Sequence, residues 1–294
     1  MSDPVIRLLT PDDLDSAFTL SSTAGWNQRL ADWRMLLGAA PGGSFAALAE
    51  GRVVGTAIAV DYERFAWIAM MIVDPAYRGR GLGRQLLEAA MGSVPPNRPI
   101  RLDATPMGRP LYQGYGFEDE AMLTRHVADG STHLRTSRPH GFALHDVRPL
   151  TRVDSAAVAA HDVQVFGGNR RAVLEWAIDG APQYARILEG DRGSIHYCLG
   201  REGRLFDQIG PVVAGDDAIA QALVSAALAA AGDRAIQLDV FDARDRFGAW
   251  LRTIGFRVQR PLYRMRRSTG TGESSIERVG SPLVEFAIVG PEFA

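Results

Sequence analysis

The chain has 294 residues, of which 46% are hydrophobic and 22% are charged, and its formal net charge is -2. This composition is typical of a soluble globular protein, and the length suggests two domains. The near-neutral charge argues against nucleic acid or an anionic membrane surface as a partner. No lysine is present, which excludes a phosphate-loop lysine and Schiff-base chemistry.

Cysteine usage and apolar patterning exclude further classes. Cys198 is the single cysteine, so an internal disulfide or a cysteine-built metal site is excluded. The six histidines lack the helical spacing of a metal site. The first residues carry an early acid instead of an apolar signal core, and the apolar stretch 218–231 is too short for a membrane span. We therefore expect a cytoplasmic monomer or homodimer without a metal.

The predicted elements of the first half mix strands and helices. The strand at 65–73 is apolar almost throughout, which is typical of a strand buried on both faces. A helix and a second strand are expected after this strand, and this strand–helix–strand order predicts two parallel strands joined by a crossover helix. The chain is therefore predicted to be an α/β protein with a mixed sheet. The expected strands are 5–9, 44–49, 53–61, 65–73, 100–104 and 117–125, and the expected helices are 11–21, 29–38, 83–91 and 107–113.

The second half repeats the plan of the first. The interval from Pro75 to Asp103 equals the interval from Pro211 to Asp239. We therefore predict a tandem duplication, with one domain at 1–130 and a second at 141–294, joined by a polar linker at 127–140. The apolar tail at 283–289 is expected to add a strand to a sheet edge. The matched segments are 6–10 with 147–151, 100–103 with 236–239, and 116–117 with 255–256.

The segment with the clearest chemistry follows the apolar strand. Pro75 ends that strand, and glycines at 79, 81 and 83 let the backbone amides turn toward one point. A helix begins there, so its unpaired amides and its positive dipole end face the same point. Arginines at 78, 80 and 84 add positive charge. The pattern predicts an anion cradle suited to a pyrophosphate.

Two other interpretations of this turn stay open. In a dinucleotide-binding fingerprint, Asp103 would contact the ribose, although the third glycine of that fingerprint is missing. Such a protein would bind NAD and act as an oxidoreductase. A glycine turn without any ligand is the simpler alternative, but a turn alone does not require three arginines.

The turn resembles the signature of the GCN5-related N-acetyltransferase superfamily, which is Arg/Gln-x-x-Gly-x-Gly/Ala between the fourth strand and the third helix. Arg78, Gly81 and Gly83 fill its positions. The superfamily also closes its domain with a Tyr-x-x-x-Gly-Phe pattern, which residues 112–117 match. The resemblance covers residues 5–126 and reaches the second half only as a degenerate copy.

This resemblance implies a site for acetyl-coenzyme A in the first half. The backbone of Met71, Ile72 and Val73 would pair with the pantetheine arm, and an amide near Met71 or Ile72 would polarise the thioester carbonyl. The amine would attack the acetyl carbon directly, and Tyr112 would give its phenol proton to the leaving sulfur. The residues around the pyrophosphate would be Arg78, Gly79, Arg80, Gly81, Leu82, Gly83 and Arg84.

The general base and the acceptor pocket are less closely defined. Many members of the superfamily carry a glutamate on the fourth strand, but residues 65–70 contain none. The candidates are Asp103, Glu63 and Asp61, and Asp103 is equally compatible with a structural role. Trp26, between the first two predicted helices, is expected to form an aromatic wall of the acceptor pocket.

The second half lacks the cradle residues. We therefore predict one competent site, which transfers acetyl to the primary amine of a small molecule. An acyl-coenzyme A sensor without turnover is the alternative. With Pro75 set against Pro211, the replacements are Ala214 for Arg78, Asp217 for Gly81 and Ile219 for Gly83, and Leu251 takes the place of Tyr112.

Overall fold

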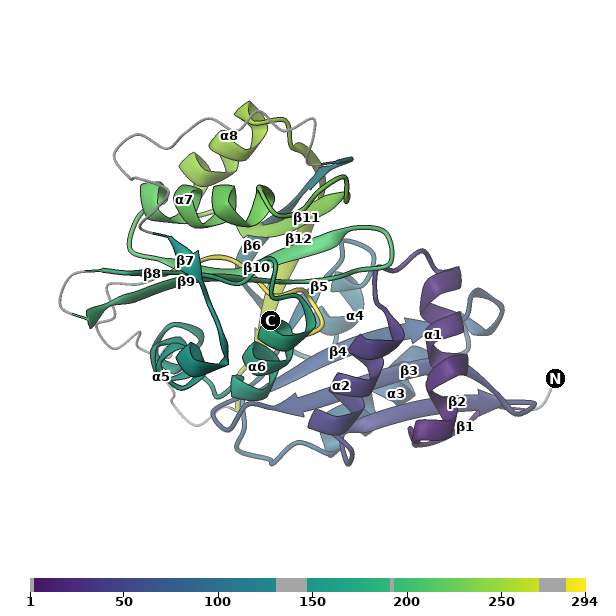
Figure 1. The fold of residues 1–294 in the computed structure, drawn as a ribbon. Helices are drawn as coiled ribbons and strands as arrows, with labels where there is room; N and C mark the ends of the chain where they lie inside the picture. The colour runs from purple at the N-terminus through teal and green to yellow at the C-terminus, as the bar shows by residue number, and fades with distance from the viewer. Residues whose placement is uncertain (1–2, 131–146, 191–192, 270–283) are drawn as a thin grey trace.

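The computed structural model describes residues 3–130, 147–190, 193–269 and 284–294. Their strands form one mixed sheet in the order β1-β2-β3-β4-β5-β12-β6-β11-β13-β10-β9-β8-β7 (Figure 1). The predicted α/β class with a mixed sheet is confirmed. Among the described residues, none of the helices combines the length and the apolar character that a membrane span requires.

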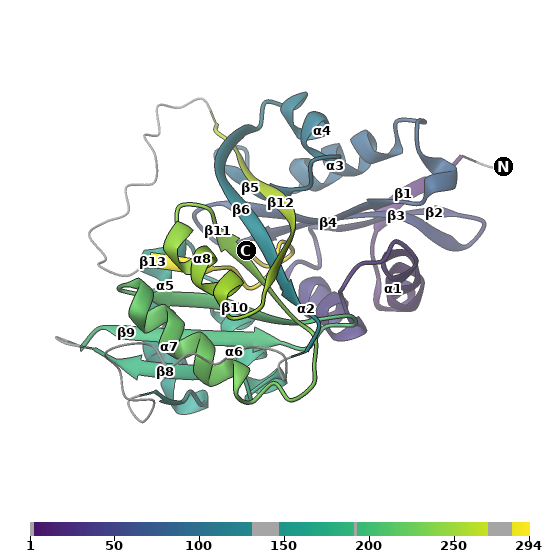
Figure 2. The same ribbon diagram turned by 90° about the horizontal axis from the view of Figure 1, so that it is seen from above.

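The first half forms the elements that its sequence predicts. Helices α1 and α2 cover one face of strands β1 to β4, and α3 and α4 cover the other face (Figure 2). The elements are β1 (Val5–Leu8), α1 (Leu14–Thr23), α2 (Leu30–Ala39), β2 (Ser44–Ala49), β3 (Arg52–Asp61), β4 (Ala66–Val73), α3 (Leu82–Gly92), β5 (Ile100–Ala104), α4 (Arg109–Gln113) and β6 (Glu118–Ala128).

The second half repeats this order of elements. Helices α5 and α6 lie on one side of its strands, and α7 and α8 lie on the other (Figure 1). The elements are β7 (Arg148–Pro149), α5 (Ser155–Phe166), α6 (Arg171–Gly180), β8 (Arg186–Glu189), β9 (Ile195–Arg201), β10 (Asp207–Ala214), α7 (Asp217–Leu228), β11 (Ile236–Phe241), α8 (Asp245–Thr253), β12 (Arg257–Arg267) and β13 (Val284–Ala287).

The two halves exchange their last long strands at the centre of the sheet. Strand β12 of the second half pairs with β5 of the first, and β6 of the first half pairs with β11 of the second. Each half therefore completes the sheet of the other, and separating them would expose unpaired backbone groups on both. Most of the predicted linker, residues 131–140, lies outside the described residues.

Matching ion pairs hold this exchange together. Arg264 of β12 donates two hydrogen bonds of 2.9 Å to Asp103 of β5. Arg125 of β6 donates two, of 2.7 and 2.8 Å, to Asp239 of β11. All four side chains are buried or nearly so, and those of both acids are fully buried. Bidentate geometry of this kind satisfies both charges where water cannot, so each pair fixes the position of one exchanged strand.

The C-terminal strand β13 lies inside the sheet, so the prediction of an edge strand is wrong. Strands β10 and β11 pair directly only at their first two residues and then diverge. Ala287 of β13 pairs with Val212 of β10 and with Val240 of β11. The diverging strands leave backbone groups without partners, and β13 satisfies them, which explains its interior position.

The residues that follow β13 fill the interface between the halves. The Tyr62 hydroxyl donates to the Phe293 carbonyl at 2.9 Å, and the Trp67 indole donates to the Pro291 carbonyl at 3.0 Å. Phe293 is fully buried in one apolar cluster with Trp33 and Trp67 of the first half. This cluster supports the face of β4 that α1 and α2 cover.

Candidate active site

Strands β4 and β5 separate from each other at the predicted site. They pair only at Ala66 with Ile100 and at Trp67 with Arg101. The other edge of β5 is paired with β12. Beyond Trp67, the edge of β4 that faces β5 therefore has no strand partner among the described residues. Residues 71–73, the ones predicted to bind the pantetheine arm, lie on this open edge.

A β-bulge interrupts β4 beside this opening. Opposite β3, Ala69 pairs with Ile58 and Ile72 pairs with Thr56, so one extra residue is inserted in β4. Met70 has a φ of 52°, which is rare for a residue with a side chain, and its carbonyl accepts a 2.6 Å hydrogen bond from Thr56 Oγ1. A bulge leaves peptide groups outside the ladder. The bulge thus turns the Met70 carbonyl to Thr56 and interrupts the regular ladder of β4 beside the open edge.

The predicted cradle follows the end of β4. Gly79 and Gly81 have φ of 76° and 80°, and no atom lies within 4 Å of where a Cβ would stand on either residue. Gly81 is the N-cap of α3, and no side chain caps that helix. The amides of residues 79–83 donate no hydrogen bond to the described part of the chain. The turn is therefore open, and its donors are free for an anion.

The charges around the cradle are positive. The side chains of Arg78, Arg80 and Arg84 are exposed there. Arg78 Nε donates to the Val73 carbonyl at 3.0 Å, which holds that side chain beside the end of β4. The acid that follows the end of β4, Asp74, accepts a 2.7 Å hydrogen bond from Arg52, and this bond holds the pKa of Asp74 below its usual value. The charge of the Asp74 carboxylate is therefore neutralised by Arg52, which lies on β3.

Tyr112 belongs to the α3 side of the sheet. It lies on α4 in the same apolar cluster as Met71 and Val73, and its ring centroid is 6.0 Å from that of Phe117. Burial raises the pKa of Tyr112 above its usual value, so the phenol keeps its proton at neutral pH. Tyr112 thus lies on the face of the sheet where Met71 and Val73 also pack, in the protonated form that a proton donor requires.

Asp103 faces the opposite side of the sheet from Tyr112. Its carboxylate is fully buried, and both oxygens accept hydrogen bonds from Arg264. The Arg264 guanidinium in turn lies 4.8 Å from the ring centroid of Trp67, on the face covered by α1 and α2. A carboxylate held in this way has no free oxygen directed to an amine, which favours the structural role.

The other base candidates lie in the β3–β4 turn. Glu63 is exposed, and its carboxylate accepts a 2.8 Å hydrogen bond from Asn169 of the second half. Asp61 is also exposed, accepts the Glu63 amide, and lies 3.4 Å from Arg98. Both carboxylates therefore accept hydrogen bonds in or beside the β3–β4 turn. Neither has a contact in the structure that directs it toward the open edge of β4.

Replacing Asp103 by asparagine is expected to destabilise the fold without a selective loss of catalysis. Breaking a buried ion pair costs up to about 3–5 kcal/mol. The matched control is Asp239→Asn, which breaks the equivalent pair with Arg125 in the other half. Denaturant unfolding should give similar losses for both variants, and kcat should fall by less than about tenfold in each. A selective fall of about 10²-fold or more in Asp103→Asn would identify Asp103 as the base instead.

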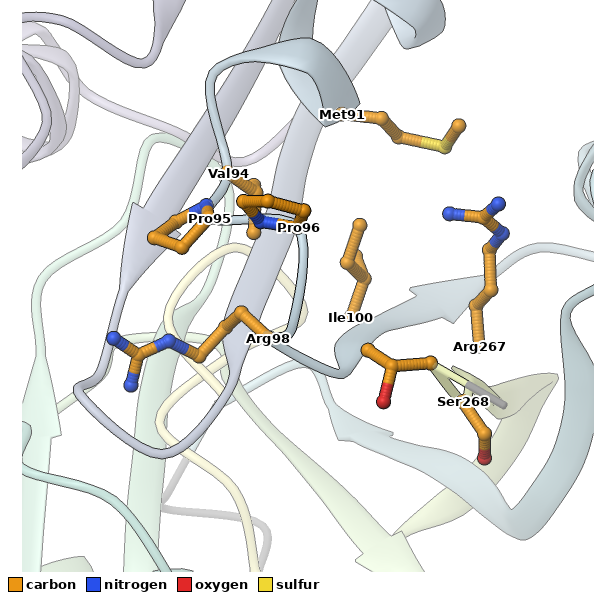
Figure 3. Close-up of a pocket in the computed structure, with 9 residues that line it drawn as sticks. Met91, Val94, Pro95, Pro96, Arg98, Ile100, Arg267 and Ser268 are labelled. Atoms are coloured by element: carbon orange, nitrogen blue, oxygen red, sulfur yellow. The ribbon is translucent and has the colours of Figure 1, made fainter. Parts of the chain in front are cut away.

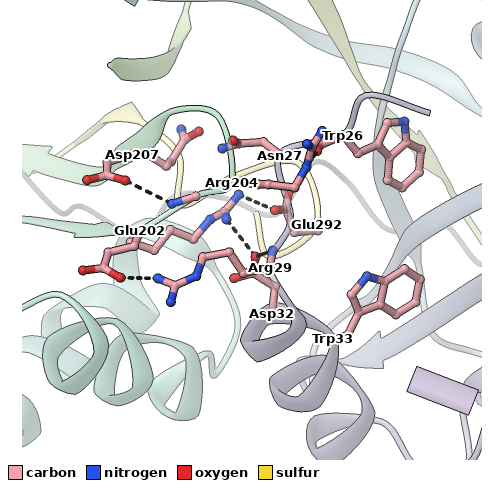
Figure 4. A network of polar contacts seen from close by, with 12 residues as sticks. Trp26, Asn27, Arg29, Asp32, Trp33, Glu202, Arg204, Asp207 and Glu292 are labelled. Atoms are coloured by element: carbon pink, nitrogen blue, oxygen red, sulfur yellow. Dashed lines mark hydrogen bonds and ion pairs between the residues drawn. The ribbon is translucent and has the colours of Figure 1, made fainter. Parts of the chain in front are cut away.

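Trp26 lies in the loop between α1 and α2, as predicted, and this loop contacts the second half. The Trp26 carbonyl accepts a 3.0 Å hydrogen bond from Arg204 Nε. Asn27 binds the same loop of the second half, because its side-chain oxygen accepts from the Leu205 and Phe206 amides at 2.8 and 3.0 Å. The Trp26 indole lies away from the ion pair of Arg29 with Glu202 (Figure 4). The second half thus supports the loop that carries Trp26.

A small cavity of about 150 Å³ lies near the other end of β5 (Figure 3). Met91, Ile100 and Arg267 are among the residues that line it. Ile100 is the first residue of β5, where β4 and β5 are still paired, so the cavity lies away from the open edge. No cradle residue lines this cavity.

The equivalent opening in the second half holds β13. Ala66 of β4 pairs with Ile100 of β5, and Asp207 of β10 pairs in the same way with Ile236 of β11. Counting along the strands from Ala66 and Asp207, residues 71–73 of β4 correspond to residues 212–214 of β10. Val212, Val213 and Ala214 are the residues that pair with β13. The second half therefore shows an extended chain held at the place where the first half has an open edge.

This correspondence corrects the alignment of Pro75 with Pro211. Pro75 follows β4, whereas Pro211 lies inside β10. The segment between β4 and α3 spans residues 74–81, and the one between β10 and α7 spans only 215–216. The second half has lost the cradle by shortening of this loop. The proposed replacements of Arg78 by Ala214, of Gly81 by Asp217 and of Gly83 by Ile219 are therefore wrong, since Ala214 corresponds to Val73.

The start of α7 shows how the short loop is closed. Asp216 is the N-cap of this helix, and its carboxylate accepts the Ile219 amide at 2.8 Å. Gly81 holds the same N-cap position in α3 and offers no such oxygen. The helix start of the second half is thus satisfied by its own side chain, and that of the first half is left for a ligand.

Sequence patterns gave no sign of several residues that shape the site. Arg264 lies far from Asp103 in the chain, and nothing local to either residue indicates the contact. The bulge at Met70 and its partner Thr56 also lack a local signal. One signal was available for the ion pairs, because Arg125 and Arg264 stand at equal distances after Gly116 and Gly255.

Comparisons with known proteins agree with this geometry. Residues 9–103 match the family model described as acetyltransferase (GNAT) family, and residues 158–278 match the one described as acetyltransferase (GNAT) domain. A segment of 182 residues is 28% identical to the uncharacterized N-acetyltransferase YitH of Bacillus subtilis. The alignment spans 61% of each chain, which is less than two thirds of that relative.

Solved structures share the whole fold. A putative acetyltransferase from Pyrococcus horikoshii superposes with a TM-score of 0.76 at 22% identity, covering 100% of this chain and 97% of that one. A tandem GNAT protein from the clavulanic acid biosynthesis pathway superposes with a TM-score of 0.60 at 14% identity, covering 92% and 100%. The tandem arrangement of two similar halves is therefore shared with at least one solved protein.

Proposed function

Because this chain belongs to the GNAT acetyltransferase family, we propose that it transfers an acetyl group from acetyl-coenzyme A to the primary amine of a small molecule. The observation that carries the proposal is the open turn at 79–83, with free amides, two left-handed glycines and an uncapped helix start. We also propose that the chain divides into a cofactor-competent domain at 1–130 and a degenerate domain at 141–294.

The residues of the first half fit the coenzyme. An anion at the turn would meet free amides without steric obstruction, because no atom lies within 4 Å of the Cβ positions of Gly79 and Gly81. The open edge of β4 at residues 71–73 suits an extended, hydrogen-bonding arm, and β13 takes the corresponding place in the second half. The exposed Arg78, Arg80 and Arg84 would face the phosphate charges.

Each group of the site has a distinct task in the proposed reaction. Acetyl-coenzyme A supplies the acetyl group as a thioester. Peptide amides beside the bulge at Met70 polarise the acetyl carbonyl as charge develops on its oxygen. Tyr112, kept protonated by burial, would give its proton to the leaving sulfur as the bond from sulfur to the acetyl carbon breaks, and the proton lost by the attacking amine would return to the phenol through water. Trp26 borders the acceptor, and Asp103 fixes β5 through Arg264 instead of acting as the base.

A time course of free thiol release tests this activity. The intact chain is mixed with acetyl-coenzyme A and with amino acids, polyamines or aminoglycosides in turn. The proposal expects at least one amine to raise thiol release above background hydrolysis, with a matching acetylated product. Binding of acetyl-coenzyme A without acceleration by any amine would contradict the transferase proposal and favour an acyl-coenzyme A sensor.

A further inference from the structure

A second hollow lies in the second half, away from the proposed active site. Its volume is about 260 Å³, and it is formed between the carboxyl end of β11, helix α8 and the exchanged strand β6. This size is below the roughly 300–1,000 Å³ of most ligand pockets, so it suits a small molecule. The polar side chains in its lining are Thr124, His126, Asp242, Arg244, Asp245 and Arg252.

The first half fills the corresponding place with a side chain. Leu102 of β5 pairs with Met265, and the equivalent Leu238 of β11 pairs with His126. The Phe117 amide donates a hydrogen bond to the Tyr112 carbonyl, and the Phe256 amide donates the equivalent bond to the Leu251 carbonyl. These two bonds align helix α4 with helix α8.

This alignment sets Arg109 against Gly248. The Arg109 guanidinium lies 4.7 Å from the ring centroid of Tyr263 and also pairs with Asp119. Gly248 has no side chain that could do the same. The hollow thus exists because a glycine replaces the arginine, and His126 replaces an apolar residue beneath it.

His126 directs an unused acceptor toward this hollow. It is only 2% exposed, and its Nδ1 lies 3.1 Å from the Thr124 carbonyl. A carbonyl only accepts, so this contact assigns the ring proton to Nδ1 and leaves Nε2 as an acceptor. Nε2 is buried and has no partner in the structure. Burial lowers the pKa of His126, so the ring is neutral near pH 7.

An arginine converges on the same point. The position of a Cβ on Gly248 lies 3.6 Å from His126 Nε2 and 3.9 Å from Arg252 Nη1. Both groups therefore border the space beside Gly248, and a ligand in the hollow would meet an acceptor from His126 and a cationic donor from Arg252. A buried acceptor without a partner is unfavourable, and a donor from a ligand would offset that cost. Among the described residues, no three His, Cys, Asp or Glu side chains come together as a metal site would require.

We propose that this hollow binds a small hydroxy- or amino-carboxylate. Its hydroxyl or ammonium group donates to His126 Nε2, and its carboxylate meets Arg252. Asp242 and Asp245 in the same lining disfavour a doubly charged group, so the dianion of inorganic phosphate should bind less well than a single carboxylate. The site uses residues of both halves, because His126 comes from β6, and it is independent of acetyl transfer.

Calorimetry on the intact chain tests the site. The probes are L-lactate and L-malate for the hydroxy acids, L-alanine and L-aspartate for the amino acids, and inorganic phosphate. We expect heat of binding from at least one of the two acid classes and weaker binding of phosphate. The two classes identify which donor, hydroxyl or ammonium, His126 accepts.

Two substitutions copied from the first half provide the decisive comparison. His126→Met removes the acceptor, and Gly248→Arg fills the hollow. Each should weaken binding of the active probe by at least tenfold. The matched control is His196→Met, since His196 is also buried with an unpartnered nitrogen but does not line the hollow. The affinity of His196→Met for the active probe should stay within about twofold of that of the unmodified chain.

The proposal is overturned if no hydroxy or amino acid binds, if phosphate binds as tightly as the acids, or if His126→Met binds as the unmodified chain does. An equal loss of affinity in His196→Met would also overturn the proposal. The weaker binding would then result from general destabilisation of the fold and not from the loss of the His126 acceptor. Unfolding midpoints of the variants are measured alongside. His126→Met keeps the test decisive if Gly248→Arg fails to fold.

Discussion

Replacing Gly81 by aspartate is expected to abolish coenzyme A binding while the chain stays folded. The residue is the N-cap of α3, and a carboxylate there would accept the helix amides, as Asp216 does in α7. It would also repel the pyrophosphate. Hydrogen bonds to a charged group contribute about 1.5–3 kcal/mol each, so losing two weakens binding by about a hundredfold or more. Calorimetry with coenzyme A measures the loss.

Gly51→Asp is the matched control for this variant. Gly51 lies in the β2–β3 turn with a φ of 75° and no atom within 4 Å of a Cβ, so the substitution introduces the same charge and the same backbone strain outside the cradle. Its affinity for coenzyme A should stay near that of the unmodified chain. Near-normal binding by Gly81→Asp, or an equal loss in the control, would contradict the placement of the pyrophosphate.

Replacing Tyr112 by phenylalanine is expected to lower kcat by about 10²–10⁴-fold, the usual contribution of a positioned acid. The KM for acetyl-coenzyme A should change little, because the phenol acts on the leaving sulfur and not on the bound cofactor. The ring stays in its contact with Phe117, so the fold is preserved. Steady-state kinetics with the acceptor identified from the amine panel give both constants.

The neighbouring tyrosine controls for loss of a phenol in this segment. Tyr115 donates to Glu88 at 2.5 Å on the exposed side. Tyr115→Phe should leave kcat within about threefold of the original, because an exposed contact of this kind contributes little. A Tyr112→Phe variant that retains most of the original kcat would show that another group, or water, protonates the sulfur.

Much of the fold could be predicted from local sequence. The apolar run that becomes β4, the turn at 79–83 and the Gly-Phe pairs at 116–117 and 255–256 all lie where expected, since period, glycine and helix-start signals are local. The sequence left a catalytic and a structural role for Asp103 equally open, and the acid that the second half keeps at Asp239 was the argument for the structural one. The shared ion-pair geometry of the two residues supports that interpretation.

The features that sequence could not give are all non-local. The exchange of β6 and β12 leaves no local signal in the sequence. The order of apolar and polar residues along each strand would be the same whether the strand joined its own half or the other one. The interior place of β13 depends on the divergence of β10 and β11, which only the assembled sheet creates. The ungapped alignment through Pro211 was wrong for a related reason, since loop shortening leaves no mark on the residues that flank it.

A crystal of the chain grown with coenzyme A tests the central claim most directly. The pyrophosphate should lie on the amides of residues 79–83, and the extended arm should run along β4 at 71–73 toward Tyr112. Density for the cofactor between β10 and β11 in place of β13, or a turn at 79–83 that stays empty at saturating ligand, would contradict the account.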